Sequence, residues 1–411
     1  MGDGRRRFWI ALALIAAFAC AVRLVYLLTL APPMGSLSDA RWYSPVSANL
    51  AAGHGFVTYP GGPSTALHPP LYPIWLAFWR ELGVNGTTAL RALSTLLGAV
   101  TTGLIGVVGR RLAGATVGLA CAALVAVHPL FITADATLLA EPLYGVMIAC
   151  VLLAAVALHE RPAPLRAALL GVAIGLATLT RSEALLLTVV LVLPLVWANP
   201  VRLRWQLFAT AAVCTGLVLT PWVIRNWSDL GRPLLSTNGG LIVAQTNNHA
   251  TYYEAPSLGA LGPYCPGWIP DEAKFSARCS RRGRRYALHH ANRWPVVVPV
   301  RMLREWSMWR HPLEAGSSGT GRRPGVYKLG ILFYYALLAV TIAGIPLLRR
   351  LGLPFRILLA PIVVVTVVGA ATWGNVRLRA PGDLALTMLA GMSIVELARR
   401  FSSSRRERAP V

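Results

Sequence analysis

Long apolar segments recur along this chain from near its first residue to near its last. The first runs from Phe8 to Leu30, which is long enough to cross about 30 Å of hydrocarbon. Further segments appear in windows of about twenty residues, with short polar stretches between most of them. With 55% hydrophobic and only 13% charged residues among 411, the chain is too apolar for a water-soluble domain of this size. The sequence therefore predicts an all-α polytopic membrane protein.

About ten membrane spans are predicted, and that number places both termini on the cytoplasmic side of the plasma membrane. No small-x-small cleavage site clearly follows the first span, which is interpreted as a signal anchor. The net charge of +23 comes from 39 basic and 16 acidic residues. Its arginine clusters fall between apolar segments, as in cytoplasmic loops rather than in a nucleic-acid-binding groove. The predicted spans lie near residues 8–30, 87–109, 114–133, 142–158, 165–181, 183–198, 205–224, 326–347, 355–373 and 382–398.

Two polar segments on the predicted outer side, 31–86 and 225–325, are too long to be turns. The first has aromatic residues at helical spacing, which predicts short amphipathic helices at the membrane interface. The second begins as a turn-rich loop and ends in a helix expected to lie on the membrane surface. It holds Cys265 and Cys279, which can pair if the segment faces an oxidising compartment. These segments divide the chain into a module of residues 1–224, the loop region 225–325, and C-terminal helices with a basic tail, 326–411.

Acidic residues are scarce, and several fall at predicted span ends on the outer side. They are Asp39, Asp135, Glu141 and Glu183. Ionisable groups at membrane depth are costly and are usually functional. Each can simply mark a hydrated helix end, but four on one face favour a shared site in an aqueous cavity.

Four arginines on the same side are not explained by the positive-inside bias: Arg181, Arg225, Arg377 and Arg379. A guanidinium group offers planar, bidentate hydrogen bonds that suit a phosphate or pyrophosphate group. Lipid head groups or the nearby acids are the alternative partners.

Two polar motifs of the second outer segment are candidates for contact with a substrate. Asn238 lies in "TNGG", which can bring the backbone close to a substrate or simply form a turn. Asn247 lies in "TNNHATYYE", whose amides and aromatic rings suit a sugar, or an ordered polar loop.

Together, the acids and arginines indicate one kind of chemistry. A carboxylate is an ordinary general base for a hydroxyl nucleophile, and arginines stabilise a phosphate as it leaves. The combination predicts transfer of a group from a lipid phosphate to an acceptor hydroxyl.

An ordered set of motifs resembles the GT-C integral-membrane glycosyltransferases, in particular the branch with the protein O-mannosyltransferases and the lipid A aminoarabinose transferases. The stretch from Asp39 to Phe56, with Tyr43 and "ANLAAGHGF", looks like the first outer loop of that family. The others follow in the order that the family uses: "HPPLYPIWLA" from His68, "AEPLYGVMIA" from Ala140, "GLATLTRSEALLL" from Gly175, "TPWVIRNW" from Thr220, "LSTNGG" from Leu235 and "VRLRAP" from Val376.

The resemblance implies the GT-C fold, a polyprenyl-phosphate sugar donor, inversion at the anomeric carbon and an extracytoplasmic active site. Asp39 matches the catalytic acid, which would act as the base, and Asp135 and Glu141 match acidic positions of the second outer loop. Arg181, Arg377 and Arg379 match basic residues near the donor phosphate, to which we add Arg225. We expect Tyr43, His54, His68, Asn238 and Asn247 to line the substrate cavity.

One position departs from the family pattern. Many relatives carry a second acid directly after the first, where this chain has Ala40. Three explanations remain open: one carboxylate suffices, Asp135 or Glu141 supplies the second, or the protein is an inactive scaffold. Some relatives hold a divalent metal, but His54, His68 and the acids show no dense ligand spacing, so no metal site or other cofactor is assigned.

The alternative from another class is a transporter or lipid flippase. Transporters tend to have inverted repeats and charges at the membrane midplane, whereas this chain places its polar groups at one face. The sugar, the carrier length and the acceptor, whether glycan, lipid or protein, are not given by the sequence.

Overall fold

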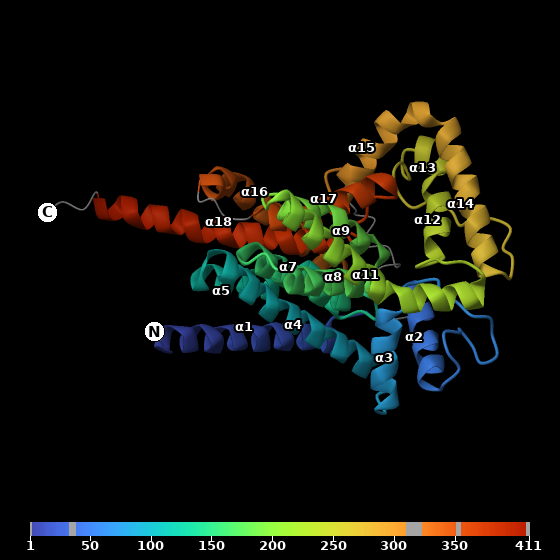
Figure 1. Cartoon of the computed structure of the whole chain (residues 1–411), viewed down its shortest axis with the longest axis horizontal. Helices are drawn as coiled ribbons and strands as arrows, with labels where there is room; N and C mark the ends of the chain where they lie inside the picture. Colours follow the sequence, from blue (N-terminus) through green and yellow to red (C-terminus); the bar gives the residue numbers. More distant parts are fainter. Residues whose placement is uncertain (1, 33–37, 310–322, 351–354, 408–411) are drawn as a thin grey trace.

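The computed structural model describes residues 2–32, 38–309, 323–350 and 355–407. The gaps remove 33–37 from the first predicted outer segment, 310–322 from the second, and 408–411 from the basic tail. Within the described ranges the chain is helical, with one isolated bridge between Val57 and Ser64 and no strand. A bundle of long helices carries a group of shorter helices at one end, and both termini lie at the other end (Figure 1).

Among the described residues, six helices are long and apolar enough to cross a membrane. The number becomes seven if α5 and α6, which are together long and apolar enough but are bent by 61°, count as one span. Three shorter apolar stretches, α8, η1 to α10, and α17, coincide with the remaining predicted spans, so the multi-pass architecture is confirmed while the count of ten stays a prediction. The six long helices are α1 (Gly2–Thr29), α4 (Thr87–Ala113), α7 (Glu141–Glu160), α11 (Val201–Leu230), α16 (Pro324–Arg350) and α18 (Ala380–Glu407).

The shorter apolar helices fill the bundle between these. Pro129 at the first turn of α6 starts a new helix after His128, since a proline cannot continue the hydrogen bonds of α5. These helices are α5 (Ala115–Val127), α6 (Pro129–Asp135), α8 (Pro164–Thr180), η1 (Ser182–Leu186), α9 (Leu187–Val190), α10 (Val192–Val196) and α17 (Arg356–Ala371).

The helices at the far end, from residues 38–81 and 238–305, form what we call the cap. In its first part, Tyr43 and Val46 pack against Tyr72 and Leu76, so both predicted amphipathic helices bury an apolar face. In its second part, a disulfide joins Cys265 to Cys279 and settles the pairing that the sequence left open. The cap comprises α2 (Ser38–Ala51), α3 (Leu71–Glu81), α12 (Asn238–Thr246), α13 (His249–Tyr253), α14 (Glu272–His289), η2 (Ala291–Arg293) and α15 (Trp294–Glu305).

Candidate active site

The predicted base lies where the cap meets the bundle. Asp39 is in the first turn of α2, where the helix dipole favours a negative charge. One of its oxygens, Oδ1, is 3.8 Å from His68 Nε2, and the other, Oδ2, accepts a hydrogen bond of 2.8 Å from Arg377 Nη2. The Asp39 side chain keeps 25% of its surface exposed, so a substrate can reach it.

Arg377 joins this acid to a second one. Its Nε donates to Glu141 Oε1 at 2.7 Å, while Nη2 holds Asp39. Glu141 begins α7 and is 3% exposed at its side chain. The amino ends of α2 and α7 therefore point two carboxylates at one guanidinium, which comes from the segment before α18.

A second arginine completes the cluster. Arg181 Nη1 lies 3.3 Å from Glu141 Oε1, and its Nε is paired with Glu183. We call Asp39, Glu141, Arg181, Glu183 and Arg377 the acid–arginine cluster. It carries three acids and two arginines, so an arriving phosphate must take arginine contacts away from carboxylates.

The charge of each group follows from its surroundings. Burial raises the pKa of Asp39, but the Arg377 guanidinium outweighs it, with help from His68 and Arg181, and lowers the pKa to about 2. Burial lowers the pKa of His68 to about 4, although Asp39 opposes this. Burial also raises the pKa of the Tyr43 hydroxyl. At neutral pH, Asp39 is an anion, while His68 and Tyr43 are neutral.

The absence of an acid at position 40 is explained by the direction in which the side chain of Ala40 points. Its side chain is fully buried in the apolar core formed by Tyr43, Val46, Tyr72 and Leu76. Neighbouring residues of a helix face different sides, so an acid at position 40 would point into this core. Glu141, from another helix, supplies the second carboxylate on Arg377.

A divalent cation does not fit this arrangement. Both Asp39 and Glu141 direct an oxygen at the guanidinium of Arg377, which takes the place between them. Within the described residues, no three His, Cys, Asp or Glu side chains gather as metal ligands.

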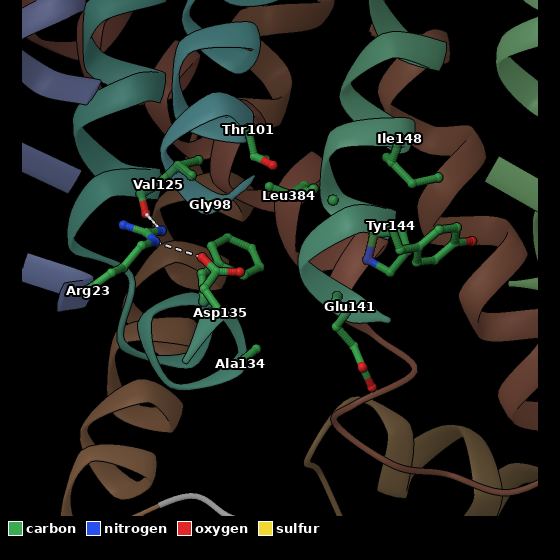
Figure 2. Close-up of a pocket in the computed structure, with 14 residues that line it drawn as sticks. Arg23, Gly98, Thr101, Val125, Ala134, Asp135, Glu141, Tyr144, Ile148 and Leu384 are labelled. Carbon is green, nitrogen blue, oxygen red and sulfur yellow. Dashed lines mark hydrogen bonds and ion pairs between the residues drawn. The ribbon is translucent and has the colours of Figure 1, made fainter. Parts of the chain in front are cut away.

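Asp135 lies in the bundle and has a different partner. Its Oδ2 is 2.6 Å from Nε of Arg23, which is fully buried and also donates to carbonyl oxygens of Ala19, Val125 and Ala126. A side chain at Gly98 would collide with this pair, so the glycine makes room for it. A cavity of about 30 Å³ separates Asp135 from Glu141 (Figure 2), which is enough for a water molecule.

Arg379 belongs to a sealed cluster near the acid–arginine cluster. Its Nε is 2.8 Å from Asp383 Oδ1, its Nη1 donates to the carbonyl of Glu305, and it lies 3.7 Å from the ring centre of Tyr334. The arginine is fully buried. The structure therefore brings together five of the eight charged residues that the sequence singles out, namely Asp39, Glu141, Arg181, Glu183 and Arg377.

The other predicted residues lie around the cluster or away from it. Arg225 pairs with Asp229 at 3.0 Å and donates to the carbonyl of Thr65. Asn238 starts α12, and its N–H bonds the carbonyl of Leu67, next to His68. Asn247 accepts from Tyr252 at 2.7 Å within the cap, and His54 is exposed in the loop after α2. Tyr43 lies 5.0 Å from His68, ring centre to ring centre.

Sequence analysis missed two residues that hold Arg377 in place. Glu305, at the end of α15, is fully buried, and its Oε2 accepts from the N–H of Asn375 at 2.8 Å. Asn375 Oδ1 in turn accepts from the N–H of Arg377 at 2.8 Å. The isolated "RE" at 304–305 carried no motif, and the buried face of α15 also holds Arg301, so no pattern in the sequence singled out Glu305.

Comparison with known proteins gives a family-model match for part of the chain. The family model of dolichyl-phosphate-mannose-protein mannosyltransferases matches residues 67–224, which include His68, Glu141 and Arg181. No curated protein matches the chain significantly in sequence.

Solved structures establish the fold. The archaeal oligosaccharyltransferase AglB from Archaeoglobus fulgidus, in complex with an inhibitory peptide and a dolichol-phosphate, matches with a TM-score of 0.58 and 11% identity over 100% of this chain and 53% of that one. The apo form of the Archaeoglobus fulgidus oligosaccharyltransferase gives 0.56 and 14%, over 98% and 52%. The chain thus spans about half the length of these proteins.

A weaker likeness is to ArnT from Cupriavidus metallidurans bound to undecaprenyl phosphate, with a TM-score of 0.48 and 17% identity over 97% of this chain and 79% of the other. The fold assignment depends on the two stronger matches. The chain has the GT-C fold, and the resemblance found in its sequence is confirmed.

Proposed function

We propose that this protein is a membrane glycosyltransferase that moves a sugar from a polyprenyl-phosphate donor to an acceptor hydroxyl on the extracytoplasmic face of the plasma membrane. The observation that carries the proposal is the acid–arginine cluster, where Asp39 and Glu141 share Arg377 at the cap end of the bundle. The solved AglB structure, which has the same fold, contains a dolichol-phosphate.

In the proposed reaction, the Asp39 carboxylate removes the proton of the acceptor hydroxyl. The oxygen then attacks the anomeric carbon from the side opposite the phosphate, and the bond from that carbon to the phosphate oxygen breaks. The phosphate leaves with the electron pair, the configuration inverts, and Arg377 and Arg181 stabilise the developing charge. The guanidinium fork is suited to such a phosphate.

The resting ion pair also provides a way to couple donor binding to base strength. With a pKa of about 2, Asp39 paired to Arg377 is a weak base. A donor phosphate that takes Arg377 removes the main cause of the low pKa and leaves the burial that raises it. Asp39 thereby becomes a stronger base only when the donor is bound.

Two features support the extracytoplasmic side. The Cys265–Cys279 disulfide in the cap suits an oxidising compartment. Arg110, in the last turn of α4, stacks on Phe8 near the start of α1. The start of α1 also carries Arg5, Arg6 and Arg7 and lies at the bundle end opposite the cap (Figure 1). Positive charge at that end is expected of a cytoplasmic face.

The test is Asp39→Asn, compared with Glu254→Gln, which removes an exposed acid elsewhere in the cap. We expect Asp39→Asn to lower sugar transfer about 10²- to 10⁴-fold, the usual contribution of a general base, while the protein accumulates normally. Envelope glycolipids, glycans and glycoproteins of cells with each variant report the transfer. Near-parental product with Asp39→Asn would remove this residue from the mechanism.

A further inference from the structure

Helix α14 presents a basic face that the proposed chemistry does not use. Arg281, Arg282, Arg284 and Arg285 are exposed. At 100° per residue, Arg281 and Arg285 lie opposite Gly283, on the same side as Lys274 and Arg278. This stripe of four basic residues covers about 16 Å at 1.5 Å per residue.

The opposite face of α14 fixes the helix firmly in the cap. A Cβ at Gly283 would lie 2.2 Å from the carbonyl oxygen of Val243, so α14 and α12 approach closely at this glycine. Ser276 Oγ donates to the carbonyl of Thr237, and the Cys265–Cys279 disulfide ties the helix to the preceding loop. The arginines therefore project from a rigid support.

The acids near the start of α14 are already engaged. Asp271 pairs with Lys274 at 2.9 Å, and Glu272 accepts from Thr65 Oγ1 at 2.6 Å and from the N–H of Ala66 at 2.9 Å. Over the ranges that the structure covers, none of Arg281, Arg282, Arg284 and Arg285 takes part in an ion pair. The stripe is thus neutralised at Lys274 and offers positive charge to a partner from Arg278 to Arg285.

The position of the face selects among anionic partners. In Figure 1, α14 lies at the end of the molecule most distant from the termini, and α12 and α13 lie between it and the bundle. Because Gly283 faces α12, the arginines point away from the spans and from lipid head groups at the membrane surface. A partner in the aqueous compartment, with charges repeated along its length, fits this stripe better than a single small anion.

We propose that the basic face of α14 docks an acidic polysaccharide that carries carboxylate groups and supplies the acceptor hydroxyl. This inference rests on the proposed function, since it names the acceptor class. Glu272 links the start of α14 to Thr65 and Ala66, just before His68, which lies beside Asp39. A chain bound along α14 is thereby directed toward the acid–arginine cluster, and the guanidinium forks suit its carboxylates.

The test uses the full chain in detergent and fluorescein-labelled polygalacturonate as the probe, with labelled neutral dextran beside it. The variant is Arg281→Gln, Arg284→Gln and Arg285→Gln together. Its matched control is Arg5→Gln, Arg6→Gln and Arg7→Gln, which removes the same charge from exposed positions at the start of α1. We expect the α14 variant to bind polygalacturonate about tenfold or more weakly, and the α1 variant to bind as the parent does, with all binding weakened by salt.

Equal losses in both triple variants would show a general effect of net charge and overturn the proposal. So would equal binding of dextran, or binding of the parent to phosphatidylglycerol vesicles but not to polygalacturonate. Asp39→Asn separates this inference from the proposed reaction, because that variant is expected to bind the polymer normally. Polymer binding without sugar transfer in every variant would contradict the proposed reaction, whereas the α14 binding surface would still be supported.

Discussion

Arg377 and Arg379 are two residues apart in the segment before α18, yet they lie in clusters of opposite character. Arg377 is 19% exposed and is shared by acids of α2 and α7. Arg379 is fully buried, with Asp383 2% exposed one helical turn further on. A partly hydrated pair can exchange partners at small cost, whereas a sealed one cannot, because water does not replace the lost contacts. The first arrangement suits a site that must receive a phosphate, and the second suits an anchor.

The largest effect on stability is expected from breaking the sealed cluster. Arg379→Leu leaves the Asp383 carboxylate buried without its guanidinium, which typically costs about 3–5 kcal/mol. Thermal unfolding in detergent and the amount of protein in membranes would report the loss. An Arg379→Leu protein that unfolds at the parental temperature would contradict the anchoring role.

The Arg377→Gln substitution is expected to weaken binding of the lipid donor rather than to destabilise the fold. Loss of a charge-assisted hydrogen bond, worth about 1.5–3 kcal/mol, corresponds to a roughly 10- to 100-fold rise in KM for the lipid donor. Transfer assays over a range of donor concentrations measure it, and Arg377→Lys, which keeps the charge without the fork, should recover part of the loss. An unchanged donor KM would count against the phosphate role.

The last prediction concerns Glu305, whose effect on stability depends on pH and is smallest near pH 5. Burial raises its pKa to about 8, although Asn375 and Arg379 oppose the shift. A carboxyl group with a raised pKa binds a proton in the folded state that it has lost in the unfolded state, so stability falls as pH rises from about 4.5 to 8. The Glu305→Gln substitution removes this dependence of stability on pH. It keeps a side-chain oxygen that can accept the hydrogen bond from the N–H of Asn375.

We therefore expect the Glu305→Gln variant to match the parent near pH 5 and to exceed its stability above that, by up to about 1.4 kcal/mol for each pH unit up to pH 8. Unfolding curves at both pH values decide this. Parallel pH dependence of the two proteins would show that Glu305 is charged in the folded state.

Much of the architecture could be predicted from the sequence because each apolar run carries its own signal. Every predicted span coincides with an apolar helix, and the first outer segment forms amphipathic helices that bury Tyr43 and Tyr72. The bend at His128 and the short helices from 182 to 196 make the number of crossings uncertain from composition alone, since one proline, such as Pro129 or Pro194, can interrupt a helix.

The site was predictable in its residue types but not in its pairings. Asp39, Glu141, Arg181 and Arg377 were named from charges at span ends, and these four meet. Arg377 and Arg379 looked equivalent in "VRLRAP" because the sequence does not show that the turn before α18 directs the two side chains to different clusters. Likewise, Asp135 looked like a site residue because its partner, Arg23, was hidden within the first apolar run.

The bond between Asp39 and Arg377 joins positions 338 residues apart. During synthesis, Asp39 and Glu141 are therefore made long before Arg377, and until then their carboxylates have no Arg377 to hold them. In the meantime, Arg181 is available to Glu141. The segment before α18 brings Arg377 to them, so the proposed phosphate site is assembled only when this late segment meets α2 and α7.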